Sequence, residues 1–125
     1  MNLVDSSAWL EYFASGANAR HFAAPIEDER ALLVPTLALY EVFKRVLAQR
    51  GEDDALKAVA YMERGKVVGL APPTALAAAR LSLELKLPMA DSIMLATARE
   101  HGATLWTQDA DFEGLGSVRW FGRKD

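Results

Sequence analysis

Short apolar segments alternate with longer segments of helical periodicity along the whole chain, and this alternation restricts the fold more than any other feature. The apolar segments have the length and composition of buried strands, and they cover residues 2–5, 31–34, 67–70, 103–107 and 118–121. Helix-type segments lie between them, at residues 8–14, 18–27, 37–50, 52–64, 74–86 and 90–101. Strands that alternate with helices favour an α/β fold. We therefore expect a short, mostly parallel, twisted sheet of four to five strands with helices on both faces.

The composition is that of one globular domain, which we expect to span residues 1–125. The chain has no cysteine, and no run of about 18 apolar residues predicts a membrane helix. We therefore expect a cytoplasmic protein that makes no contact with a membrane. The net charge is −3, whereas proteins that bind nucleic acid are usually basic. If four acids were committed to a metal ion, however, the remaining charge would be +1, so the total excludes neither kind of partner.

The stretch at residues 87–112 has the clearest local pattern. Its helix places Asp91 on the same face as the apolar Leu95, one turn further on. Asp109 and Asp111 follow the next strand, in an acidic loop. A carboxylate on the inner face of a helix is costly unless a cation meets it, so this pattern requires an explanation.

Four acids are predicted to converge. In a parallel sheet, ligands bind at the carboxyl ends of the strands, where the following helices also begin. Asp5 ends the first predicted strand and Asp109 follows the fourth, and Glu41 and Asp91 lie in early helical turns at that edge. Crowded carboxylates stay ionised together only around a cation, and oxygen ligands select Mg²⁺ or Mn²⁺. Such a site is suited to the cleavage of phosphodiester bonds.

Each of these acids also has a structural explanation that the sequence leaves open. The alternatives are helix capping for Asp5, an ion pair with Arg45 for Glu41, the helix dipole for Asp91, and turn formation for Asp109 and Asp111. The hydroxyls of Ser7 and Thr107 could orient a carboxylate or hold a metal-bound water, or could serve only capping and turn formation. The two histidines fit no zinc spacing, and the chain has no glycine-rich phosphate loop.

Three blocks of sequence form a recognisable pattern. They are the opening LVDSSAWLEYF, the helix start TLALYEV, and the long run LPMADSIMLATAREHGATLWTQDADF. In the long run, Leu-Pro precedes an acid on an Ala-rich helix, and a glycine and a short strand lead to T-x-D-x-D-F. Over nearly its whole length the chain resembles PIN-domain ribonucleases, most closely the VapC-type toxins of prokaryotic toxin–antitoxin pairs.

The resemblance implies a PIN-like three-layer α/β/α fold and a specific set of site residues. By position, the acidic quartet that holds Mg²⁺ or Mn²⁺ in the family corresponds to Asp5, Glu41, Asp91 and Asp109. Ser7, Thr107 and Asp111 correspond to supporting positions. The implied activity is metal-dependent hydrolysis of RNA in the cytoplasm. The implied partners are an RNA substrate, a cognate antitoxin that inhibits the enzyme, and a second copy in a homodimer or a larger toxin–antitoxin assembly.

Two other classes of protein are compatible with acids at strand ends. A receiver-type signalling domain also uses such acids with Mg²⁺, but it needs an acceptor aspartate after the middle strand. Here the third predicted strand ends in Gly69-Leu70-Ala71-Pro72, without an acid. A non-catalytic PIN-like module that only binds a protein partner would keep its binding when the acids are replaced by alanine.

Overall fold

A parallel sheet forms the centre of the computed structural model, which describes residues 1–124. Within that range the sheet has five strands in the order β3-β2-β1-β4-β5, and every neighbouring pair is parallel. The strands are β1 (Asn2–Val4), β2 (Leu32–Pro35), β3 (Lys66–Val68), β4 (Thr104–Thr107) and β5 (Val118–Trp120). The predicted α/β fold is confirmed, and the sheet is parallel throughout.

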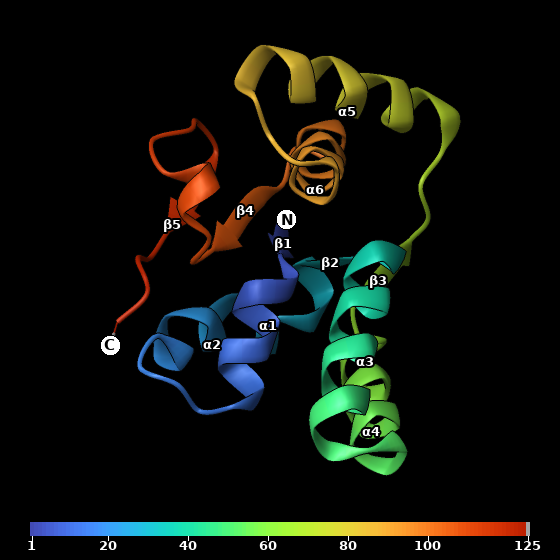
Figure 1. Cartoon of the computed structure of the whole chain (residues 1–125), viewed down its shortest axis with the longest axis vertical. Coiled ribbons are helices and arrows are strands. Elements are labelled where there is room, and N and C mark those ends of the chain that lie inside the picture. Colours follow the sequence, from blue (N-terminus) through green and yellow to red (C-terminus); the bar gives the residue numbers. More distant parts are fainter. Residues whose placement is uncertain (125) are drawn as a thin grey trace.

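Helices cover both faces of this sheet and produce the three-layer α/β/α arrangement (Figure 1). Helix α6 (Met89–Glu100) packs on β1 and β4, and α5 (Pro72–Leu85) packs on the outer side of α6. On the other side lie α1 (Ser6–Phe13) and α2 (Ala19–Glu27) (Figure 1). Helices α3 (Thr36–Arg50) and α4 (Glu52–Met62) form a hairpin joined at Gly51, beside β2. Among the helices of residues 1–124, none has the length and apolar character that a membrane span requires.

The central strands are buried because β1 has a neighbour on each side and helices on both faces. Leu3, Val4, Leu33 and Leu105 are completely inaccessible to solvent. Near-continuous apolar runs are typical of strands in such parallel sheets, which explains why β1 and β2 show no alternation of polar and apolar residues. The loops that follow these strands therefore start from fully buried backbone in the core of the domain.

The strand order reverses at β1. From β1 the chain proceeds to β2 and β3 on one side of the sheet, and later to β4 and β5 on the other side. In open parallel sheets this reversal leaves a crevice at the carboxyl ends of the two strands that flank it. Asp5 directly follows β1, and Gln108 and Asp109 directly follow β4. The topology thus brings residues from both ends of the sequence to one crevice.

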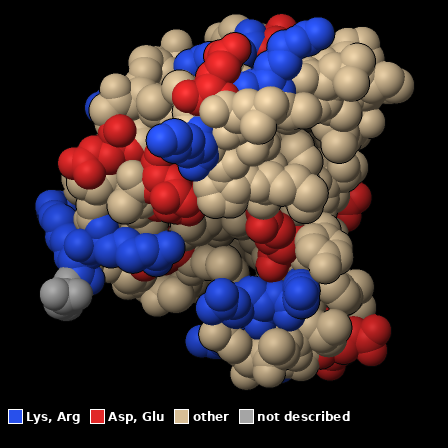
Figure 2. All heavy atoms as spheres, turned by 45° about the horizontal axis from the view of Figure 1, so that its top comes forward, with Lys and Arg blue, Asp and Glu red and all other residues tan. Residues whose placement is uncertain are grey.

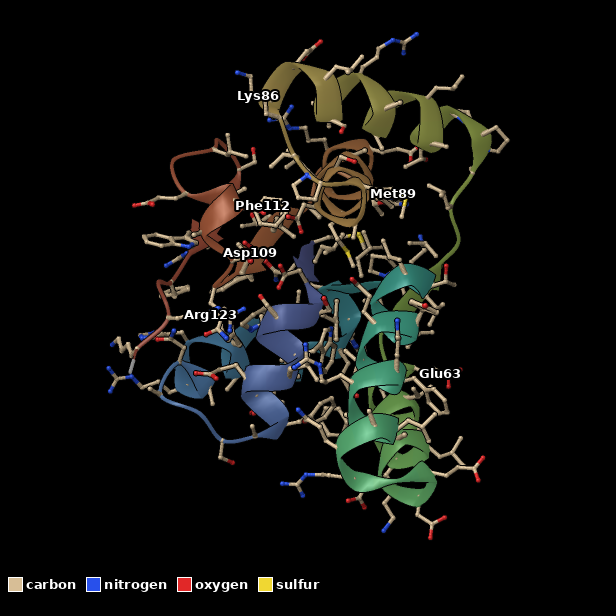
Figure 3. The ribbon with its side chains drawn as sticks, in the orientation of Figure 1. Glu63, Lys86, Met89, Asp109, Phe112 and Arg123 are labelled. Carbon is tan, nitrogen blue, oxygen red and sulfur yellow. The ribbon has the colours of Figure 1, made fainter. Side chains whose placement is uncertain are left out.

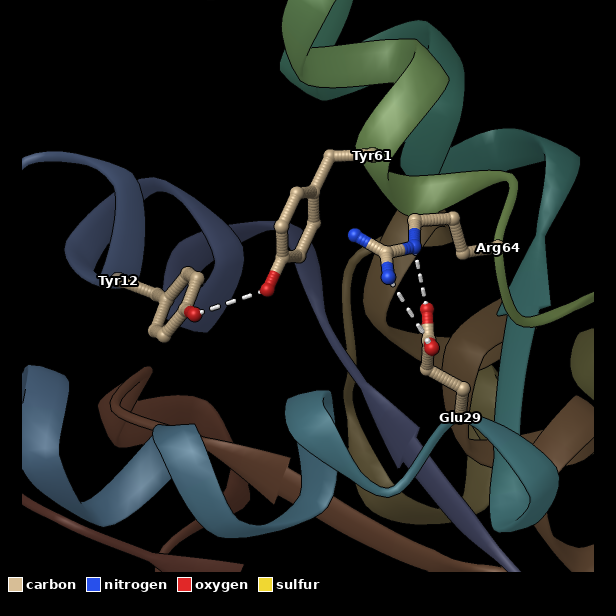
Figure 4. Close-up of polar contacts among 4 residues, drawn as sticks. All are labelled: Tyr12, Glu29, Tyr61 and Arg64. Atoms are coloured by element: carbon tan, nitrogen blue, oxygen red, sulfur yellow. Dashed lines mark hydrogen bonds and ion pairs between the residues drawn. The ribbon is translucent and has the colours of Figure 1, made fainter.

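The hairpin of α3 and α4 is tied to the rest of the domain by side-chain contacts. The hydroxyls of Tyr12 on α1 and Tyr61 on α4 are hydrogen-bonded at 3.0 Å (Figure 4). Arg64, just after α4, forms an ion pair with Glu29, whose Oε2 lies 2.6 Å from the arginine Nε (Figure 4). The first contact holds α4 against α1, and the second holds the end of α4 to the segment between α2 and β2.

Most predicted boundaries agree with the structure within two residues, and the differences have local causes. The side chain that caps α1 is that of Asp5, not that of a serine, because its Oδ1 accepts a hydrogen bond from the Ala8 amide. Asn18 precedes α2 but makes no capping bond, since its side chain is engaged elsewhere. The acidic loop after β4 contains a short 3₁₀ turn, Ala110–Phe112, which the sequence did not predict.

Candidate metal centre

Three carboxylates from two segments meet at the crevice. Asp91 lies in the first turn of α6, Asp109 follows β4, and Asp111 lies in the 3₁₀ turn. Each can offer an oxygen such that all three oxygens lie within 4.8 Å of one another. Asp109 orders the turn, because its Oδ1 accepts a hydrogen bond from the Asp111 amide at 3.0 Å. The fully buried Phe112 anchors the same turn, beside Asp109 (Figure 3).

Asp5 is buried next to this group and is held by three hydrogen bonds. Its Oδ1 accepts from the Ser7 hydroxyl at 2.7 Å and from the Ala8 amide at 3.0 Å. Its Oδ2 accepts from the Thr107 hydroxyl at 2.6 Å. Asp5 therefore does cap α1, the structural alternative left open by the sequence. Its Oδ2 nevertheless faces β4, and the hydrogen bond from Thr107 connects Asp5 to the acidic loop that follows this strand.

Thr107 connects Asp5 to Asp109. Its hydroxyl donates to Asp5 and accepts a hydrogen bond from the Asp109 amide at 2.9 Å. The Ser7 hydroxyl lies 3.4 Å from that of Thr107. Both predicted supporting hydroxyls are thus in contact with Asp5. They orient this carboxylate and the backbone that carries Asp109.

Glu41 lies at the edge of the site rather than within the group of three. Its Oε1 accepts a hydrogen bond from the Ser6 hydroxyl at 3.0 Å, which holds the side chain beside the start of α1. The alternative ion pair with Arg45 does not form between these two described residues. The contact with Ser6 joins residues 35 apart in the sequence and was not predicted.

Burial and mutual repulsion raise the pKa values of two of these acids. Burial raises the pKa of Asp5 to about 6, against the effect of its hydrogen bonds from Thr107 and Ser7. Burial, a hydrogen bond with Asp111 and the nearby charges of the other acids raise the pKa of Asp91 to about 8. Of the ion pairs within residues 1–124, none involves any of these carboxylates. A group of crowded oxygen ligands without a protein cation fits a divalent ion such as Mg²⁺ or Mn²⁺.

A groove of about 560 Å³ opens beside this site, between α1 and the hairpin of α3 and α4. Ser7 and Gln108 belong to its wall, so the groove reaches the residues next to Asp5 and Asp109. On the face drawn in Figure 2, acidic and basic side chains border a hollow of the surface. The apolar part of the groove includes Leu10, Phe13 and Val46, and the cations along it are Arg45, Arg50, Lys57 and Arg123.

A buried amide pair supports the loop that carries Asp109, and sequence reasoning missed it. Asn18 is completely buried, and its Nδ2 donates to Gln108 Oε1 at 3.1 Å and to the Gly122 carbonyl at 2.9 Å. Gln108 is buried between the neighbours Thr107 and Asp109. The sequence signal available was a lone Asn before a helix, which is more typical of a cap.

The structure thus gathers Asp5, Asp91 and Asp109 with Asp111 at the reversal of strand order, and leaves Glu41 at the edge.

The sequence pattern of the PIN domain family matches residues 3–117. This match spans most of the chain, which therefore belongs to the PIN domain family.

Solved structures with the same fold include several toxins and toxin–antitoxin complexes. A toxin–antitoxin complex from Klebsiella pneumoniae matches with a TM-score of 0.77 at 24% identity, over 95% of this chain and 96% of that one. VapC20 of Mycobacterium tuberculosis is described as a toxin that cleaves the sarcin–ricin loop. It matches with a TM-score of 0.75 at 18% identity, over 93% of this chain and 95% of that one. DNA-bound VapBC from Salmonella typhimurium matches with a TM-score of 0.74 at 14% identity, over 98% of each chain. At such identities the likeness extends to the fold alone. No curated protein sequence matches the chain.

Membership of the PIN domain family argues against the receiver-type alternative, because receiver domains form a different family. The assignment of the quartet as metal ligands stays a prediction. So does the supporting role of Ser7 and Thr107, although their hydrogen bonds to Asp5 are consistent with it.

Proposed function

We propose that this protein is a VapC-type toxin of a toxin–antitoxin pair, acting in the cytoplasm as a metal-dependent endoribonuclease. Residues 1–125 act as one PIN domain in this proposal. The observation that carries it is the crowding of Asp91, Asp109 and Asp111 within 4.8 Å, next to the buried Asp5. Such an arrangement opposes folding unless a cation occupies it, and it is suited to phosphodiester hydrolysis. The chain shares its fold with VapC20, a toxin described as cleaving the sarcin–ricin loop, and this supports the choice of RNA over other phosphodiesters.

The residues have distinct roles in this mechanism. Asp5, Asp91 and Asp109 are the proposed ligands of Mg²⁺ or Mn²⁺, and Asp111 is close enough to add a fourth oxygen. When bound, the ion neutralises charge that develops on the scissile phosphate and makes a water more acidic. Glu41, held by Ser6, either completes the ligand set or accepts the proton of the attacking water.

Thr107 and Ser7 keep this constellation rigid. Their hydroxyls hold both oxygens of Asp5, so the side chain does not have to reorganise when the ion binds. Preorganised carboxylates lose little conformational entropy on binding, which favours a tight site.

The proposed inhibitor is a cognate antitoxin, and the proposed assembly is a homodimer or a larger complex with that antitoxin. The groove beside Ser7 and Gln108 has an apolar floor and a cationic border, which suits an amphipathic segment of a partner. Leu76, Leu83 and Met89 on α5 and α6 are more than 60% exposed, and such apolar exposure supports a protein contact.

The test is cleavage of a panel of labelled RNAs by the purified chain with Mg²⁺, with Mn²⁺, or with EDTA. We expect cleavage with either ion and none with EDTA. Asp91→Asn should abolish cleavage, whereas Glu113→Gln, at an exposed acid just after the 3₁₀ turn, should not change it. Equal cleavage by the wild type and Asp91→Asn would show that the mechanism is wrong.

A non-catalytic protein-binding module is the second candidate, and the groove of about 560 Å³ favours it. The two functions predict the same binding but opposite biological effects for the same variants. If the module only binds a partner, alanine at Asp91 and Asp109 should leave both binding and the biological effect intact. If the chain is a nuclease, the same variants should bind the antitoxin normally and lose toxicity.

A further inference from the structure

Four side chains form a continuous stack on the β4–β5 side of the sheet. The rings of Trp106 and Phe121 are stacked at 6.1 Å with an interplanar angle of 16°. His21 of α2 is stacked on Phe121 at 4.4 Å and 10°. The guanidinium of Arg119 lies 4.7 Å from the centre of the Trp106 ring. The order along the stack is therefore His21, Phe121, Trp106 and Arg119. The rings of Phe121 and Trp106 lie inside it, and the histidine and the arginine form its two ends.

This stack is only partly covered and lies in a positively charged environment. His21, Trp106 and Phe121 are all partly accessible to solvent, and Arg119 is exposed. Arg20 directly precedes His21 in α2, and Lys124 lies three residues after Phe121, so the chain carries two cations beside members of the stack. Desolvation and the charges of these two cations lower the pKa of His21. A stacking surface flanked by cations attracts a base whose neighbouring phosphates are negative.

The stack is mechanically connected to the acidic site. Trp106 belongs to β4, the strand whose end carries Asp109. His21 lies one helical turn after Asn18, to whose carbonyl its amide donates at 2.9 Å. The Asn18 side chain in turn donates to Gln108, the residue before Asp109. Hydrogen bonds therefore join the helix that presents His21 to the loop of the proposed metal centre.

We propose that His21, Phe121, Trp106 and Arg119 form a platform for single-stranded RNA, on which a base stacks while Arg20 and Lys124 hold its phosphates. Successive bases stack on aromatic side chains without strong sequence preference, and cations along the strand neutralise its phosphates. A double helix hides the faces of its bases, so the platform selects unpaired RNA. This inference rests on the proposed nuclease function, because it takes the substrate of that site as its ligand.

The experiment measures binding of a labelled single-stranded oligouridine to the whole chain in EDTA, where no turnover is expected, by fluorescence anisotropy. We expect His21→Ala to weaken binding about tenfold and His21→Phe to preserve it, because phenylalanine keeps the stacking face. Arg20→Gln, which removes one of the proposed phosphate contacts, should weaken binding and reduce the slope of log affinity against log salt by about one. Arg80→Gln, which removes an exposed arginine on α5, is the matched control and should bind like the wild type. Circular dichroism spectra verify that each variant is folded.

Three results would overturn the platform. They are binding within twofold of the wild type for His21→Ala combined with Arg20→Gln, a loss in Arg80→Gln equal to that in Arg20→Gln, and equal affinity for a duplex of the same length. Cleavage in Mg²⁺ is measured separately, so none of these three results would contradict the proposed nuclease. A wild type that binds through these residues but does not cut RNA would instead contradict the proposed nuclease and retain the platform.

Discussion

Acids of this molecule occupy two opposite electrostatic environments, one with a cation as partner and one with other acids as neighbours. Glu29 lies on the surface and is paired with Arg64 at 2.6 Å, so its charge is compensated within the protein. Asp91, Asp109 and Asp111 crowd together at the crevice, and burial and repulsion raise the pKa of Asp91. An exposed ion pair of the first kind contributes little to stability, and a crowded group of the second kind costs stability. The difference separates an acid that is paired within the fold from the acids for which we propose a catalytic role.

The largest expected effect is on catalysis by the crowded group. Asp109→Asn removes a charge but keeps an oxygen that can accept the hydrogen bond from the Asp111 amide. We expect kcat/KM for RNA to fall by at least about a hundredfold, since metal ligands and charge-stabilising groups have effects of this size. Steady-state cleavage in Mg²⁺ checks this. A loss below tenfold would place the catalytic centre elsewhere.

The second prediction concerns pH. The pKa of Asp5 rises from 3.8 in the unfolded chain to about 6 in the folded one, so the folded state holds the proton more tightly. Its contribution to stability is then complete below pH 3.8 and is lost as the pH rises through 6. Asp91, with a pKa of about 8, extends the loss to higher pH. In EDTA we expect the free energy of unfolding to fall by about 1–3 kcal/mol between pH 5 and pH 8.

Mg²⁺ or Mn²⁺ should reverse this loss, because the ion binds only the folded, ionised site. Urea denaturation at both pH values, with EDTA and with either ion, provides the measurement. Stability that rises from pH 5 to pH 8 without metal would contradict the electrostatic description of the crevice.

The third prediction isolates the link between Asp5 and the loop. Thr107→Val preserves shape but removes the hydrogen bonds with Asp5 and the Asp109 amide. At pH 8 we expect a loss of about 1 kcal/mol in unfolding free energy, and a smaller loss at pH 5, where Asp5 is protonated. Thr97→Val is the matched control, because this buried threonine bonds only to the Ile93 carbonyl of its own helix. A pH-independent loss in Thr107→Val would mean that the bond to Asp5 does not contribute to stability and that the hydroxyl acts through the Asp109 amide.

The fold was predictable because its signals are local. Strand-type and helix-type segments alternate in the sequence, and parallel pairing follows from that order. The positions of Asp5 and Asp109 after strands were enough to place both at the carboxyl edge. These inferences need no knowledge of how any side chain is oriented.

The detailed contacts were not predictable because they join residues far apart in the chain. Ser6 contacts Glu41 across 35 residues, and Asn18 contacts Gln108 across 90. Their geometry depends on how α1, α2 and α3 are placed on the sheet. The same holds for Asp111: the 3₁₀ turn directs its carboxylate toward Asp91, and a sequence pattern of alternating acids does not define that turn.

The smallest expected effect concerns the compensated acid. Glu29→Gln removes the ion pair with Arg64, whose side chain is 59% exposed. Because water screens such a pair, we expect a loss of less than about 1 kcal/mol in unfolding free energy and no change in RNA cleavage. The same urea and cleavage assays apply. If Glu29→Gln reduced cleavage as strongly as Asp109→Asn, the contrast between the two groups of acids would fail. The position of α4, which this ion pair helps to fix, would then have to control the catalytic centre.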